Sequence, residues 1–164
     1  MHSYVIPPIL QSLRAMDKVL GIAEQHCTDK SLDPATLLTF RLFPDMFNFT
    51  RQVQLTTDFA VRCPARLTGA DLPAFPDVET TFPELRDRVQ RASDFVKTFD
   101  ADSFQGAEDR EIVLKLRSGE MVLKGQQYAS SYALPQLFFH LTTAYNILRH
   151  NGVVLGKRDY MGAT

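Results

Sequence analysis

The side chains best suited to chemistry in this sequence are its four histidines, because an imidazole can bind a metal or move a proton near neutral pH. They lie far apart, at His2, His26, His140 and His150. His2 falls at the chain terminus and His26 at the expected end of a helix. His150 precedes Asn151-Gly152, where a partly cationic ring favours the C-terminal helix dipole. Only His140 is expected to flank the inward face of a helix, so it is the one histidine we consider for a site.

Around His140 we predict a ligand-binding pocket to which Tyr145, Asn48 and Thr50 contribute. Tyr145 falls on the buried stripe of the same predicted helix, and Asn48 and Thr50 fall near the start of another. A simpler interpretation stays open for these side chains: a core-edge histidine, a tyrosine anchored to a buried acceptor, and a threonine that bonds back to the preceding turn. No nucleophile motif is present, so the catalytic residues stay unknown.

A tight transition-metal site is not predicted, because such a site needs three or more nitrogen or sulfur donors that converge on one point. The segment 44–62 offers only Asp45, Asn48 and Asp58, and the segment 134–150 offers His140 alone. Asp45 and Asp58 project from different sides of their helix, so they cannot both approach His140. We therefore predict no metal and no other cofactor.

The two cysteines, Cys27 and Cys63, have no spacing typical of a metal or redox motif. Each is expected at the end of a helix. If those two helices run antiparallel, the thiols lie about 30 Å apart, which is too far for a disulfide. Both are predicted to stay reduced.

The composition favours one soluble, cytoplasmic domain over residues 1–164. The chain has 45% hydrophobic residues and a net charge of -1, so it can bury a core but has no basic surface for nucleic acid or an anionic membrane. Its apolar runs are far shorter than the roughly 20 residues that cross a bilayer. Neither nucleic acid nor a membrane is an expected partner.

Four long helices must position these residues, because four segments repeat apolar residues at three- and four-residue steps. They are predicted over residues 3–26, 44–62, 82–99 and 134–150. The last is the most strongly patterned, and Asn151-Gly152 marks its end. The charges at 86–91 are interpreted as a solvated helix face.

Two connections carry further information. The segment 63–80 has three prolines and no periodicity, and it is long enough to run back along a helix so that the second and third helices become parallel. The segment 111–124 has Ser118-Gly119 between two runs rich in Ile, Val and Leu. This pattern predicts a β-hairpin that lies against the helices.

Two stretches carry a family resemblance, FHLTTAYNILRHNGVVLGKRDYMG at residues 139–162 and, more weakly, LFPDMFNFTRQVQ at residues 42–54. They resemble a domain-of-unknown-function family of the DinB/YfiT-like superfamily. The resemblance implies an all-α, up-down-down-up four-helix bundle that is commonly dimeric, with relatives regarded as metalloenzymes, among them thiol-dependent transferases.

In those relatives a metal is held by one histidine of the second helix and two of the fourth, spaced four apart. This sequence departs from that pattern. Gln136 and Ala144 stand four residues either side of His140, and 44–62 has no histidine. The metal chemistry that the resemblance implies therefore does not carry over.

Two functions stay open on the residues alone. The first is metal-independent binding of a small molecule beside His140, with a degenerate relative of the metal- or thiol-dependent transferases as a variant of it. The second is a non-catalytic interaction protein that forms a homodimer through Phe139, Leu55 and Phe59, which cannot all face one core. The sequence does not decide whether the protein is an enzyme.

Overall fold

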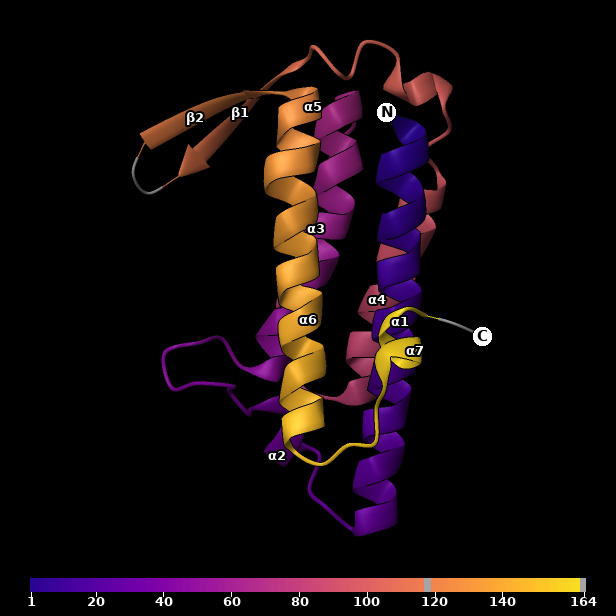
Figure 1. The fold of residues 1–164 in the computed structure, drawn as a ribbon, viewed down its shortest axis with the longest axis vertical. Coiled ribbons are helices and arrows are strands. Elements are labelled where there is room, and N and C mark those ends of the chain that lie inside the picture. Colours follow the sequence, from indigo (N-terminus) through magenta and orange to yellow (C-terminus); the bar gives the residue numbers. More distant parts are fainter. Residues whose placement is uncertain (117–118, 163–164) are drawn as a thin grey trace.

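The structure is a computed structural model that describes residues 1–116 and 119–162. The chain is mostly helical and carries one two-stranded antiparallel hairpin, which confirms the predicted fold class at that level (Figure 1). Within the described ranges, no helix has the length and apolar character that crossing a bilayer requires.

The long helices are α1, α3, α4 and α6, and three of them differ at their ends from the predicted ranges. They span His2–Lys30, Phe49–Thr68, Phe82–Lys97 and Leu134–His150. α6 matches its predicted range. It continues, however, a helical column that begins with α5 (Gly125–Tyr128) and a π-helical segment, η2 (Ala129–Ala133) (Figure 1).

The predicted range 44–62 was wrong at both ends, for local reasons. α3 begins only after Asn48, whose side chain accepts a hydrogen bond from the Arg51 backbone N–H at 3.0 Å and so caps the helix. The helix then continues through Cys63 and Pro64 because its next apolar residues are buried, and it ends at Gly69, where φ is +80°.

Three short elements complete the helical part of the chain. α2 (Ala35–Leu38) precedes α3, a 3₁₀ turn called η1 (Asp102–Phe104) follows α4, and α7 (Lys157–Tyr160) lies near the C-terminus. α7 packs on α1: Lys18 pairs with Asp159 at 3.2 Å, and the Gln11 amide donates to the Met161 carbonyl at 3.1 Å.

Contacts between helix ends give the directions of the long helices. The rings of Phe49 and Phe82, the first residues of α3 and α4, lie 6.2 Å apart, so these two helices start at the same end. His2 contacts Phe104, beyond the far end of α4, so α1 runs opposite to α4. The segment 69–81 therefore runs back along α3 before α4 begins (Figure 1).

The core lies between these helices and includes residues from each of them, such as Leu20, Val53, Leu85 and Leu141. Cys27 and Cys63 are both buried and free. Cys63 lies inside α3 rather than at its end. Burial raises the pKa of both thiols, that of Cys63 to about 12, so neither is a reactive thiolate at neutral pH.

The hairpin pairs β1 (Glu111–Leu116) with β2 (Gly119–Lys124), as predicted over 111–124. Part of the predicted Ser118-Gly119 turn lies outside the described residues. Ile112 and Leu114 of β1 are buried in the core cluster, so this face of β1 packs on the rest of the protein. The opposite face, with the pair Val113 and Val122, is exposed, and the hairpin projects sideways beside α5 (Figure 1).

One residue of the predicted solvated face of α4 is instead the largest fully buried side chain, Arg88. Its guanidinium contacts the Asp58 carboxylate of α3 at 2.7 Å and the Glu79 carboxylate of the segment 69–81 at 3.0 Å. It also donates to the Thr57 hydroxyl at 2.7 Å and the Pro76 carbonyl at 3.0 Å. Arg88 therefore ties the returning segment to both helices, and the assignment of residues 86–91 to solvent was wrong at this position.

Candidate functional site

The four predicted site residues lie at different places and have different partners. His140 is 7% exposed and faces α3. Asn48 caps α3, the Thr50 hydroxyl donates to the Leu38 carbonyl at 3.0 Å, and the Tyr145 ring packs edge-on to Tyr160. In the described part of the chain no hydrogen bond or ring contact joins any two of these four.

The residue that the structure places against His140 is Gln52 of α3, which the sequence analysis did not consider. The His140 Nδ1 and Gln52 Oε1 atoms lie 2.8 Å apart, and Gln52 is buried. A signal for it existed, because Gln52, Thr56, Phe59 and Cys63 recur at three- and four-residue steps and form the face of α3 toward α6. A search for apolar periodicity does not select Gln52, because its side chain is polar.

The amide of Gln52 fixes the proton position on His140. Its Nε2 donates to the Phe47 carbonyl at 3.1 Å, which turns its Oε1 toward the imidazole. An amide oxygen only accepts, so the Nδ1 of His140 must donate. In the neutral ring the proton is then on Nδ1, and Nε2 carries a lone pair.

The lone pair on Nε2 of His140 is open to solvent. Nε2 has no hydrogen-bond partner in the described residues, whereas every fully buried side-chain nitrogen or oxygen there has one. Burial, and secondarily the charge of Arg51, lower the pKa of His140 from 6.5 to about 4. The imidazole is therefore neutral at physiological pH, and Nε2 is a hydrogen-bond acceptor or a base.

Aromatic rings surround His140 along the seam between α3 and α6. Phe59 stacks on the imidazole at 5.7 Å with an interplanar angle of 14°, and Phe139 meets its edge at 5.3 Å. Tyr132 contacts Phe59 edge-on, with the ring centroids 6.2 Å apart. Phe59, predicted to lie at a dimer surface, is thus half-buried within the chain.

A groove of about 350 Å³ lies on the outer side of this aromatic cluster, along the helical column of η2 and α6. It is lined by Ser131, Tyr132, Pro135, Gln136 and Phe139. Its upper part is the π-helical turn 129–133, and such turns are rare and occur frequently at functional sites. Gln136, half-buried and one turn before His140, makes no hydrogen bond to any described residue.

Comparison with known proteins identifies the family. A family model described as a domain of unknown function, DUF1993, matches residues 1–161. The chain belongs to the DUF1993 family. No curated protein matches it.

A solved structure supports the wider relationship of this DUF1993 chain. The crystal structure of a DinB family member protein from Shewanella denitrificans is 38% identical, with a TM-score of 0.92, and the match covers 98% of this chain and 90% of that one. The resemblance to a DinB-like domain of unknown function is therefore confirmed.

The metal implied by the superfamily does not fit the donors that this DUF1993 chain offers. The described residues contain no group of three His, Cys, Asp or Glu side chains able to hold one. Asp58 is paired with Arg88 and Arg62, and Asp45 is exposed. Among the described residues, the polar side chain that contacts His140 is the Gln52 amide, and one imidazole with an amide is a poor set for a transition metal.

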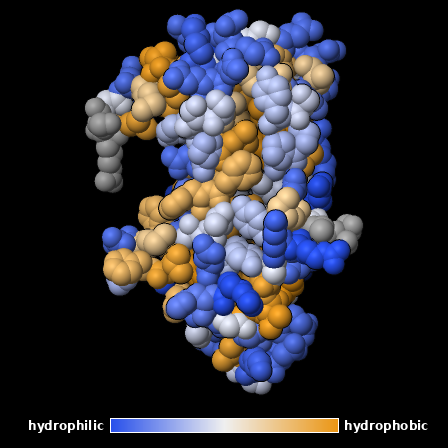
Figure 2. Space-filling view, viewed as in Figure 1, coloured by the Kyte–Doolittle hydropathy of each residue, from blue (hydrophilic) through white to orange (hydrophobic). Residues whose placement is uncertain are grey.

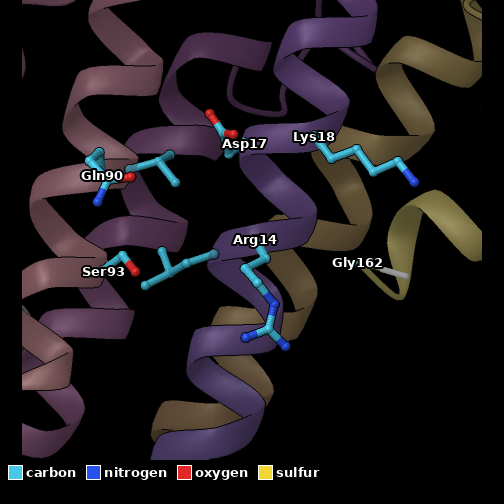
Figure 3. Close-up of a pocket in the computed structure, with 8 residues that line it drawn as sticks. Arg14, Asp17, Lys18, Gln90, Ser93 and Gly162 are labelled. Atoms are coloured by element: carbon cyan, nitrogen blue, oxygen red, sulfur yellow. The ribbon is translucent and has the colours of Figure 1, made fainter. Parts of the chain in front are cut away.

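A second groove, of about 320 Å³, lies between α1, α4 and the C-terminal segment (Figure 3). Figure 3 shows Ser93 of α4 facing α1, with Arg14 and Lys18 extending from α1. Asp17 is paired with Arg86, and Lys18 with Asp159. Asp17 and Lys18 are occupied by these ion pairs and Arg14 is exposed, so none of the three is held by a buried partner as His140 is held by Gln52.

The lowered pKa of His140 predicts a pH dependence of stability. The unfolded histidine binds a proton below about pH 6.5, whereas the folded one binds it only near pH 4, so folding is opposed as the pH falls through this window. Solvent access at Nε2 reduces the effect, which we expect to be about 2 kcal/mol.

The measurement is urea unfolding at pH 7 and pH 4.5 for the wild type, His140→Gln and His150→Gln. The loss of stability on acidification is expected to be smaller in His140→Gln than in the wild type. His150 is exposed, so His150→Gln is the matched control and keeps the wild-type loss. Equal losses in all three proteins would show that His140 titrates normally.

Proposed function

We propose that this protein is a metal-independent small-molecule-binding domain that takes its ligand in the groove beside His140. The observation that carries the proposal is the neutral imidazole whose Nδ1 is held by Gln52 and whose Nε2 is open to solvent. Fixing a polar group next to apolar walls costs side-chain freedom, and such pre-organisation is typical of binding sites.

The architecture behind this proposal is a single domain with an up-down-down-up, DinB/YfiT-like four-helix bundle. Its four members are α1, α3, α4 and the column that ends in α6. The parallel starts of α3 and α4 at Phe49 and Phe82 support this order. So does the antiparallel pairing of α6 with α3, in which His140 meets Gln52 and Tyr128 meets Arg66 at the other end.

The other predicted site residues take indirect roles in this proposal. Asn48 starts α3 and Thr50 ties its first turn to Leu38, so both help to place Gln52. Tyr145 packs on Tyr160 and helps to hold the C-terminal segment. Only His140 of the four is proposed to contact the ligand.

The test is a titration of uniformly labelled protein with small-molecule fragments, monitored by two-dimensional NMR. Binding is expected to shift signals of His140, Gln136 and Phe139, while signals around the second groove at Arg14 and Ser93 stay unchanged. Shifts confined to the second groove, or no shifts with any fragment, would contradict the proposal.

A second candidate is a homodimeric interaction protein, and the exposure of Phe139 favours it. Phe139 is 56% exposed and Phe138, beside it, is 38% exposed. Figure 2 shows hydrophobic side chains at the surface along the α6 column. If two copies of this surface pair, light scattering at tens of micromolar protein is expected to give twice the mass of one chain. The variant Phe139→Ser is then expected to give the mass of a monomer. A monomeric wild type would remove this candidate.

A further inference from the structure

The outer edge of the hairpin is a surface that the proposed function does not use. Among the described residues, β2 pairs with β1 alone, and the hairpin projects sideways from the helices (Figure 1). β2 is also the less covered strand: only Leu123 is half-buried, whereas Ile112 and Leu114 of β1 are buried. The second edge of β2 therefore carries backbone N–H and C=O groups with no strand beside them.

The register of the hairpin determines which backbone groups point away from β1. The Gly125 N–H donates to the Arg110 carbonyl at 2.8 Å, and this pair continues the register that places Val122 opposite Val113. In an antiparallel ladder, residues that bond to the partner strand alternate with residues whose N–H and C=O point the other way. Counting back from Gly125, the N–H and C=O groups of Val122 and Glu120 therefore point outward.

The side chains at this edge are complementary to a second copy of the same strand. Glu120, Val122 and Lys124 alternate along β2, so they share one face, and all three are exposed. The negative charge lies two residues before Val122 and the positive charge two residues after it. When two copies of β2 pair antiparallel about Val122, each Glu120 lies opposite the Lys124 of the other copy, and the two valines meet at the symmetry axis.

The charges within one hairpin leave room for this pairing. Lys124 contacts Glu111 of β1 at 3.3 Å, and both side chains are exposed. Lys115 lies opposite Glu120 in the register, but no ion pair joins Glu120 to another described residue. A second copy would give the Glu120 carboxylate an oppositely charged partner, whereas a strand with charges of one sign would repel its own copy.

We infer that a second copy of this chain pairs at the edge of β2, so that two hairpins form one four-stranded antiparallel sheet with the two β2 strands in the middle. The two Val122 residues exchange backbone hydrogen bonds across the axis, and the exposed valines of both copies become neighbours on one face. Four strands are also more stable than an isolated two-stranded ribbon. This interface goes beyond the proposed function and does not use Phe139.

The experiment is sedimentation equilibrium of the full chain at tens to hundreds of micromolar protein. The contact is short, so we expect a reversible dimer whose fraction rises with concentration, as is typical of small interfaces. Phe139→Ser is the matched control and is expected to associate like the wild type, because Phe139 lies outside this edge. Val122→Pro is expected to be monomeric, since proline removes the outward N–H and leaves the bonds to β1 in place.

Charge reversal tests the register of the pair. Glu120→Lys and Lys124→Glu are each expected to weaken self-association by about tenfold, because both attractive pairs across the axis become repulsive. Mixed in equal amounts, the two variants are expected to form a heterodimer about as stable as the wild-type dimer, since opposite charges meet again. Both side chains are exposed, so neither substitution disturbs the core.

Three results would overturn the inference. The first is a wild type that stays monomeric at every concentration. The second is a mixture of Glu120→Lys and Lys124→Glu that associates no more strongly than either variant alone. The third is loss of the dimer in Phe139→Ser with its persistence in Val122→Pro, which would place the contact on α6 instead of the hairpin.

Discussion

Replacing Arg88 with leucine is expected to lower the free energy of unfolding by about 3–5 kcal/mol. The fully buried guanidinium holds Asp58 at 2.7 Å and Glu79 at 3.0 Å, and both carboxylates are themselves buried. Without it, two negative charges are left in the interior without their main partner. Burial already raises the pKa of Asp58 against the opposing effect of Arg62 and Arg88, which shows how unfavourable that charge is.

The matched control is Arg91→Leu, on the same helix. Arg88 and Arg91 both lie over the Phe75 ring. Arg91, however, is exposed, and its one ion pair with a described residue is the pair with Asp87. Its loss is expected to cost less than about 1 kcal/mol. Urea unfolding of the two variants measures both values. Adding Asp58→Asn and Glu79→Gln to Arg88→Leu should recover part of the loss, because the unpaired charges are then gone. If Arg88→Leu and Arg91→Leu lower the free energy of unfolding equally, the buried ion-pair cluster around Arg88 does not stabilise the fold as argued.

The double substitution Gln52→His with Gln136→His is expected to give a protein that purifies with about one zinc per chain. The Gln52 side chain already touches the imidazole of His140 at 2.8 Å from the facing helix. Gln136 lies one turn before His140, half-buried on the groove. Three imidazoles at these places would give the ligand set that the present donors lack.

Elemental analysis of untagged protein gives the result. The control is the same double variant carrying His140→Ala, which leaves two imidazoles and is expected to lose most of the metal. A double variant that folds and stays free of metal would show that Gln52, Gln136 and His140 do not converge. Near-stoichiometric metal in the wild type would instead contradict the conclusion about its donors.

The parts of the fold that the sequence predicted are those decided by local pattern. α6 came out with its predicted bounds, because its apolar periodicity is strong and Asn151-Gly152 ends it. The start of α3 was wrong because two local signals competed, and the cap at Asn48 determined the start rather than Pro44. Local chemistry alone does not rank two such signals.

Two buried residues that the sequence did not predict, Arg88 and Gln52, were missed for a different reason. Arg88 and Gln52 are polar side chains buried against partners far away in the chain: Arg88 meets Asp58 from 30 residues earlier, and Gln52 meets His140 from 88 residues later. A pattern search assigns polar residues to solvent, since burial of a polar group is favourable only with its partner in place. Those partners become visible only in the folded chain.

The central claim is that His140 keeps an unprotonated, solvent-accessible Nε2 at neutral pH. Two-dimensional NMR of protein with ¹⁵N-labelled histidine measures this directly, because it distinguishes the two ring nitrogens and their protonation. We predict a proton on Nδ1 and none on Nε2 at pH 7, unchanged down to about pH 5, since burial lowers the pKa of His140 to about 4. A proton on Nε2 at pH 7, or a titration centred near pH 6.5, would contradict the claim.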